Sequence, residues 1–316
     1  MTGTLWESNG GVYRLPELLE WELTYTAGAP CDSFSVRCVY DPDMDGHLHR
    51  AVEFTAESGG ERMFYGVVDE YQITWDGNGR QVEVAGRGMA ARLLDNEAEA
   101  QEYQTATLDD ILDNHVRPYG ITVGDRESLP PVPGFAVASG SSQWQVLYQF
   151  ACYYGGVTPR FDRTGRLLLC GWKDGTRRVL DGRTPVLAIR KREKRYGVLS
   201  EILVRDKPQK RVESIRNRAF LSEGGSCSRV ITMPGRSSYQ DMRYSGEYQI
   251  RRSEAERNRV ELTVAAPFWG WPGELAELRL ERIGLTGEYR ILEASTGTGG
   301  EGAWTRLTLG DPDALV

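Results

Sequence analysis

Long hydrophobic runs are missing from this 316-residue sequence. No segment approaches the roughly 18 to 20 consecutive apolar residues that a membrane-spanning helix needs. Residues 1–6 contain no basic stretch followed by an apolar one, so we expect no secretory signal. We therefore expect a protein that folds in the cytoplasm and does not insert into a membrane.

Cysteine and histidine are both scarce. The cysteines form no CxxC pair, and their odd number favours reduced, mostly buried thiols over a disulfide framework; they are Cys31, Cys38, Cys152, Cys170 and Cys227. On a strand, His47 and His49 would share a face, as two zinc ligands do. No cysteine or further histidine lies near them, and His115 falls on the apolar stripe of a predicted helix. We interpret all three as core or loop residues and predict no metal site.

Signatures of catalysis are missing as well. The GxSxG motif of a serine nucleophile is absent, and Cys152 has no recognisable motif around it. Carboxylates are abundant but form no distinctive pair, so residue types alone leave a glycosidase open. We predict no enzyme and no cofactor.

A calcium loop is only half present. Asp41, Asp43 and Asp45 alternate and Gly46 follows them, as in the first half of such a loop. The twelfth position is Val52 rather than an acidic residue, so an acidic turn between strands is the stronger interpretation.

Charge is unevenly distributed. The net charge of -7 and the pI near 5.3 argue against attraction of the whole chain to nucleic acid or anionic membranes. Residues 1–120 are acidic, whereas residues 177–218 are basic and include Arg190, Lys191, Arg192, Lys194 and Arg195. This cluster can meet phosphates, but we favour a solvated or intersubunit face that pairs with the acidic first third.

Three large aromatic residues occupy one turn: Phe268, Trp269 and Trp271. Exposed aromatics on a loop are candidates for binding a partner or a sugar. Packing across the end of a barrel explains them equally well. Together with the basic cluster, they are our predicted partner-interface residues.

Short alternating strands predict β structure in the first 95 residues. The clearest is a hairpin in which Tyr71, Ile73 and Trp75 alternate with polar residues before a glycine-rich turn at residues 76–79. An earlier strand is expected to carry Leu48, Val52 and Phe54. A hairpin cannot bury its apolar face alone, so these strands predict a small antiparallel barrel or sandwich.

The rest of the chain is predicted to contain a mixed α/β segment followed by a β-rich segment. Residues 95–106 are expected to be a polar linker, Thr107 precedes an amphipathic helix, and residues 143–154 form a second helix. Residues 205–229 and 234–250 are expected to be long polar loops. Alternation returns in the C-terminal part and predicts a second β-barrel.

In this order, the pieces resemble the hub proteins of contractile phage tails and related injection systems, the late control protein D family with its T4-type and Mu-type relatives. The segments that carry the resemblance are residues 64–94, 107–112, 118–120, 143–156, 162–169, 272–274, 287–291 and 305–309. The resemblance implies a mainly β (α+β) fold with two antiparallel tube-type β-barrels and a small α/β insert. It also implies three domains, at residues 1–95, 96–175 and 176–316, with strands within 176–215 completing the first barrel.

The resemblance implies a structural function without catalysis. Such hubs are homotrimers whose two barrels per chain give pseudo-sixfold symmetry, so that a hexameric tail tube meets a trimeric spike. The expected partners are the tail tube protein, a separate spike protein, and other baseplate and tape-measure proteins. DNA is expected to pass through the lumen without sequence-specific binding, and the expected location is the baseplate of a phage or phage-tail-like particle. The alternatives are a tail-associated cell-wall hydrolase and a carbohydrate-binding β-sandwich adhesin that uses Trp269 and Trp271.

Overall fold

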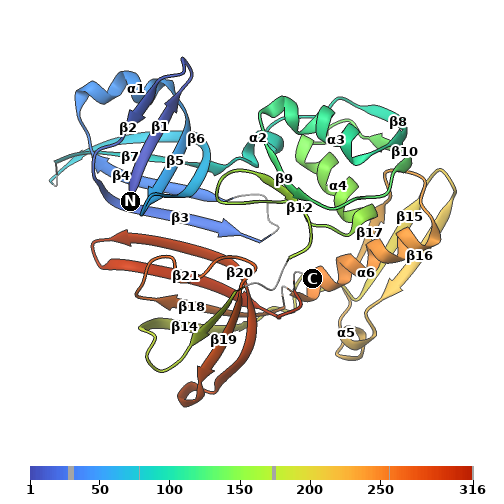
Figure 1. Ribbon diagram of the computed structural model, residues 1–316. Helices are drawn as coiled ribbons and strands as arrows, with labels where there is room; N and C mark the ends of the chain where they lie inside the picture. The colour runs from blue at the N-terminus through green and yellow to red at the C-terminus, as the bar shows by residue number, and fades with distance from the viewer. Residues whose placement is uncertain (28–31, 78, 173–175, 256, 315–316) are drawn as a thin grey trace.

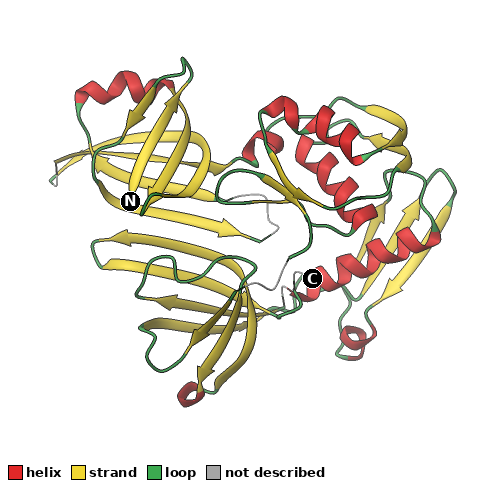
Figure 2. Cartoon of the chain, viewed as in Figure 1, coloured by secondary structure: helices red, strands yellow, loops and turns green. Residues whose placement is uncertain are grey.

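The computed structural model describes residues 1–27, 32–77, 79–172, 176–255 and 257–314. Figure 1 shows an N-terminal β-rich part in blue, an α/β part in green to orange, and a C-terminal β-rich part mainly in red. Most helices gather in the α/β part (Figure 2). The predicted mainly β fold with antiparallel sheets is confirmed.

The N-terminal β-rich part packs around a core that includes Leu5, Leu23, Phe34 and Phe54. Its elements in chain order are β1 (Thr2–Glu7), β2 (Val12–Arg14), β3 (Leu18–Thr26), β4 (Ser33–Val39), η1 (Pro42–Met44), α1 (Asp45–Arg50), β5 (Ala51–Ser58), β6 (Glu61–Asp76) and β7 (Gly79–Gly88).

The predicted β6–β7 hairpin is present and contains a close backbone crossing. A Cβ atom on Gly66 would lie 2.1 Å from the Arg87 carbonyl oxygen, and one on Gly86 would lie 2.0 Å from the Val67 carbonyl oxygen. Only glycine allows two strands to approach this closely. A register shift between Val68 and Glu70 follows the crossing.

The segment around Leu48 corrects one prediction, because it is helical rather than a strand. The Asp41 side chain accepts a hydrogen bond from the Asp43 amide and forms a capping box with Met44, and Pro42 follows the cap. These features favour a helical start. Met44 and Leu48, four residues apart, then bury their side chains in the core, and the strand begins only at Ala51.

The C-terminal β-rich part has its own core, which includes Leu180, Leu262, Ile291 and Leu309. Its elements are β13 (Arg177–Leu180), β14 (Val186–Glu193), β18 (Asn258–Val264), β19 (Leu275–Leu280), η3 (Glu281–Ile283), β20 (Leu285–Gly299) and β21 (Gly302–Gly310).

One sheet joins the two β-rich parts. Strand β20 pairs antiparallel with β3, with Thr296 opposite Leu23 and Ala294 opposite Tyr25. All four side chains are buried, so both cores lie on the same face of this sheet. The strand order is β14-β18-β21-β20-β3-β4-β7-β6-β5-β1-β2; in addition, β19 pairs with β20, and β13 pairs with β19. Among the described residues this sheet is open, so the two predicted closed barrels are not confirmed.

The α/β part surrounds a third core, which includes Ile111, Phe135, Leu147 and Phe150. Its first elements are α2 (Ala91–Leu94), β8 (Gln101–Ala106), α3 (Leu108–His115), η2 (Arg117–Tyr119), β9 (Val123–Arg126), β10 (Val132–Val137), α4 (Gln143–Gly155), β11 (Arg160–Phe161) and β12 (Leu167–Leu169). The two predicted helices are confirmed. The expected linker at residues 95–106 is wrong in its second half, because β8 pairs with β10.

A later segment of the chain joins this α/β part. It contains β15 (Glu201–Asp206), β16 (Arg211–Arg216), α5 (Arg218–Ser222), β17 (Ser228–Thr232) and α6 (Tyr239–Ala255). Strand β15 pairs with β16 and β17, and its Val204 shares a core with Met233 and Met242. The predictions of long loops and of strands within 176–215 completing the N-terminal barrel are therefore wrong. Strands β13 and β14 pair with β19 and β18 instead.

No helix in the described part of the chain combines the length and apolar character needed to cross a membrane.

Candidate partner interface

The predicted basic cluster begins on β14, which ends the long sheet. Strand β14 pairs with β18 on one side, and no described strand pairs with its other side. Arg190, Lys191 and Arg192 are exposed there. Lys191 stands opposite the buried Val260 and so lies on the core side of the sheet, whereas Arg190 and Arg192 lie on the opposite side. Arg190 reaches the Glu261 carboxylate at 3.3 Å.

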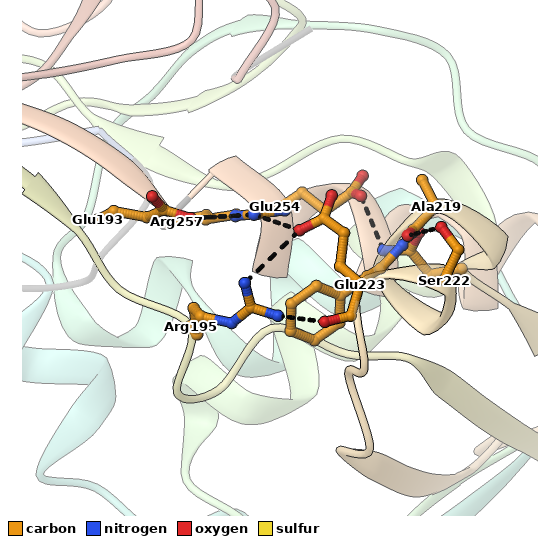
Figure 3. Close-up of polar contacts among 9 residues, drawn as sticks. Glu193, Arg195, Ala219, Ser222, Glu223, Glu254 and Arg257 are labelled. Atoms are coloured by element: carbon orange, nitrogen blue, oxygen red, sulfur yellow. Dashed lines mark hydrogen bonds and ion pairs between the residues drawn. The ribbon is translucent and has the colours of Figure 1, made fainter.

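The end of the cluster turns toward α5 instead of following the strand. The Arg195 guanidinium donates a hydrogen bond of 2.6 Å to the Glu223 carbonyl oxygen (Figure 3). The Lys194 ammonium lies 5.6 Å from the centre of the Tyr196 ring. The structure thus separates the predicted cluster into an edge-strand group and a group at the junction with α5.

Sequence reasoning missed the acidic partners at this junction. Arg257 binds the carboxylates of both Glu193 and Glu223 (Figure 3). Its hydrogen bond holds the pKa of Glu223 below the ordinary value. Arg195 and Arg257 also both lie 5.5 Å from the centre of the Phe220 ring. The sequence gives no signal for this group, because its members come from three separate segments.

The aromatic turn packs between the two β-rich parts. Phe268 stacks on Trp21 with ring centres 5.3 Å apart and on Trp271 at 5.7 Å. Trp271 meets Tyr25 edge to face at 5.0 Å, and Trp269 packs against the C-terminal core. Their half-buried positions fit packing across the end of a β-rich part. A role for these rings in partner binding stays a prediction.

Phe268 adopts an uncommon backbone conformation within this turn. Its φ of 52° lies in the left-handed region, which bulky residues rarely occupy. Its amide donates a hydrogen bond of 2.9 Å to the Thr296 hydroxyl, and its ring lies between Trp21 and Trp271. These contacts stabilise a conformation that costs free energy by itself.

A cleft of about 300 Å³ lies beside Trp271, where all three parts of the chain meet. Arg160 stacks over the Trp172 ring at 4.2 Å, and Arg163 lies 5.4 Å from the Trp271 ring. Burial raises the pKa of Asp32 to about 7, although the amide and hydroxyl of Thr26 donate hydrogen bonds to its carboxylate. Nothing in the sequence around Asp32 indicated this environment.

The other residues that were considered as metal ligands or catalytic groups are buried or contact neighbouring side chains. His47 lies on α1, where its Nδ1 is 2.5 Å from the Glu7 carboxylate and its ring stacks on Tyr13. His115 is buried, and its Nδ1 lies 2.7 Å from the Gln143 side-chain oxygen. Burial lowers the pKa of His115 and raises that of the Cys152 thiol to about 11.

The described residues contain no group of three or more potential metal ligands. The four described cysteines are free, and Cys31 lies outside the described residues. His47 and His49 do not share a strand face, because both lie on α1.

A second surface feature comes from the β6–β7 hairpin. Tyr71, Ile73 and Trp75 are 40%, 42% and 75% exposed. Tyr71 stands opposite Val84 and Ile73 opposite Val82, and both valines are buried in the core. The apolar face of the core therefore continues onto an exposed strand. We call residues 69–76 the β6 edge.

Known proteins share this architecture. No family model matches the sequence. The baseplate hub protein gp44 of Escherichia phage Mu is 30% identical over 132 residues, which cover 40% of this chain and 34% of the phage protein. The match thus spans about a third of the length of that relative.

Two solved structures match nearly the whole chain. The tail protein from Neisseria meningitidis MC58 has a TM-score of 0.79 at 15% identity, with 99% of this chain and 96% of that chain covered. The 43 kDa tail protein of prophage MuSo2 from Shewanella oneidensis has a TM-score of 0.73 at 21% identity, with 100% and 99% covered.

The chain therefore has the fold of these two tail proteins. In addition, part of the chain is similar in sequence to a phage baseplate hub protein, in agreement with the resemblance described above.

Proposed function

We propose that this chain is the structural baseplate hub of a contractile tail, a homotrimeric, pseudo-hexameric adaptor between a hexameric tail tube and a trimeric spike. The observation that carries the proposal is the continuous sheet, in which β20 and β3 join two β-rich parts with their cores on one face. Two joined units per chain, repeated three times, would supply six units around an axis.

The fold comparisons support a tail protein, and the partial match to the phage Mu hub supports the hub position. We propose that the chain assembles in the bacterial cytoplasm and resides in the baseplate of a phage or phage-tail-like particle. Its proposed partners are the tail tube, spike and tape-measure proteins, and its function requires no cofactor. A net charge of -7 would keep passing DNA from binding tightly to the conduit.

We also propose residues 1–95 and 176–316, apart from residues 201–255, as the regions that build the ring, and residues 96–175 as an insert outside it. Residues 201–255 would extend this insert, because they share its core. The exposed residues Arg190, Lys191 and Arg192 remain proposed interface residues, because they lie on a strand edge with no described partner strand.

Light-scattering mass and negative-stain images test the hub proposal. The purified chain is measured alone and with its candidate spike protein. We expect a trimer that appears as a six-lobed ring with a central hole. A monomer under both conditions would overturn the proposal.

A second candidate is a tail-associated cell-wall hydrolase, which the raised pKa of Asp32 in a cleft beside Asp162 favours. A general acid needs such a pKa near neutrality. Loss of peptidoglycan turnover in Asp32→Asn would support the hydrolase, whereas absence of turnover in the unmodified chain would exclude it.

The other alternative is the carbohydrate-binding adhesin. Glycan binding that is lost in Trp269→Ala would support it.

A further inference from the structure

Strand β6 extends beyond its neighbour β5. The pairing of β5 with β6 ends at Val67, whereas β6 continues to Asp76. Each residue of the β6 edge is exposed and, among the described strands, only β7 pairs with this segment. One side of the β6 edge thus presents backbone amide and carbonyl groups that another strand can pair with.

Strand β14, at one end of the sheet, presents a matching edge. Strand β14 has 8 residues and, in the described chain, an unpaired outer side. Eight paired residues would extend over roughly 27 Å. On the core side of β14, Ile189 packs against the C-terminal core. Leu187, at the register shift between Val186 and Ala188, is 63% exposed.

Charge distinguishes the two edges. Glu70 and Asp76 stand opposite Ala85 and Gly79, and both carboxylates lie on the side of the sheet away from the core. Arg190 and Arg192 lie on that same side at β14. Two β14 edges would repel each other, as would two β6 edges, whereas a β6 edge and a β14 edge attract.

Strand direction allows this pairing. Seven successive antiparallel pairings separate β14 from β6 within the chain, so the two strands run in opposite directions. A copy related by rotation about a ring axis would present its β14 antiparallel to this β6. Both edges also have their cores on the same face, so the sheet would continue without inversion.

We infer that the β6 edge of one copy pairs antiparallel with β14 of the next copy, and that this head-to-tail contact closes the ring. The inference rests on the proposed homotrimer and names the surfaces that build it. Tyr71, Ile73 and Trp75 then pack against Ile189 and Lys191 of the neighbouring copy, which lie on the core side of β14, while Glu70 faces its arginines. Because the two surfaces differ, the contact is heterologous and generates a ring by rotation.

Charge reversal on the full-length chain tests the inference, with the spike protein added if the unmodified chain requires it to form a trimer. Arg192→Glu and Glu70→Arg should each raise the dissociation constant of the trimer at least tenfold. The double variant Arg192→Glu/Glu70→Arg should restore much of the affinity, because the attraction is re-formed with opposite sign. Arg251→Glu, an exposed reversal on α6, is the matched control and should leave the trimer unchanged.

A second measurement distinguishes a weakened contact between copies from a folding defect. Trp75→Ala should weaken the trimer while leaving the far-ultraviolet circular dichroism spectrum unchanged, because Trp75 is 75% exposed within its own chain. Trimers of unchanged affinity in Arg192→Glu, Glu70→Arg and Trp75→Ala would overturn the β6–β14 contact and leave the hub proposal standing. A monomeric unmodified chain, with or without spike, would overturn the hub itself.

Discussion

Arg257 and Glu193 lie 2.9 Å apart and tie the start of β18 to the end of β14. The same guanidinium binds Glu223 at the end of α5, so one side chain connects the long sheet with the α/β part. Its fork-shaped group can donate hydrogen bonds to two carboxylates at once, which an ammonium group does less well.

Arg257→Ala should therefore lower the midpoint of thermal unfolding by about 2 to 4 °C. It should also speed hydrogen exchange of amides in residues 218–227. Arg243→Ala, which breaks an exposed pair with Glu247 within α6, is the control and should change the midpoint less. Equal effects of the two variants would contradict a connecting role for Arg257.

Asp32 should make stability depend on pH. Burial raises its folded-state pKa to about 7, above the unfolded value near 3.9. Between these values the folded state holds a proton that the unfolded state has released, so the free energy of unfolding falls as pH rises from about 4 to about 7. The slope is at most about 1.4 kcal/mol per pH unit, and less here because the side chain keeps some contact with solvent.

Asp32→Asn should flatten this part of the pH profile, because an amide does not titrate and its oxygen can still accept the hydrogen bonds from Thr26. Urea unfolding at pH 5 and pH 8 measures the difference. An unchanged slope in the variant would show that other groups cause the pH dependence.

Replacing each of two tryptophans by alanine should change the free energy of unfolding by very different amounts. Trp271→Ala removes a ring that packs against Phe268 and Tyr25, so we expect a loss of about 3 kcal/mol in the free energy of unfolding. Trp75→Ala should change it by less than about 0.5 kcal/mol in the monomer, because that ring contacts chiefly solvent and Arg80. Denaturant titrations of the two variants decide whether the aromatic turn stabilises the fold.

The more deeply a cysteine is buried, the more slowly its thiol should be labelled. Burial raises the pKa of Cys38 and Cys152 to about 11, so both remain protonated and inert at pH 8. Cys170 and Cys227 are only partly buried and should react with iodoacetamide first. Mass spectrometry of peptides after brief labelling gives the order, and early modification of Cys152 would contradict the buried position on α4.

The sequence predicted those elements whose local signals agreed with their packing. Thr107 and the stripe of Ile111 and Leu112 located α3, and the alternation around Tyr71 located β6. Helix α6 was missed because its mean hydropathy is low and its buried face includes Ser245 and Gly246. Small residues allow close packing on β15 and β16 but give no hydrophobic pattern.

The candidate site was predicted only in part, for a related reason. A basic run is visible in sequence, so Arg190, Lys191 and Arg192 were found. The contact of Arg257 with Glu223 joins residues 34 positions apart, and no local pattern indicates it. The pairing of β3 with β20 was missed for the same reason, because edge complementarity depends on how the whole chain folds.

The junction of β3 with β20 also constrains how the chain folds during synthesis. The Thr24 and Ser295 hydroxyls lie 2.8 Å apart across that junction, although 271 positions separate them in sequence. A ribosome that adds about 5 to 20 residues per second would need roughly 15 to 50 s to make this stretch. Throughout that time the outer edge of β3 lacks its partner strand. The nascent chain would therefore expose a pairing edge until β20 emerges, which makes it a natural client for a chaperone that shields strand edges.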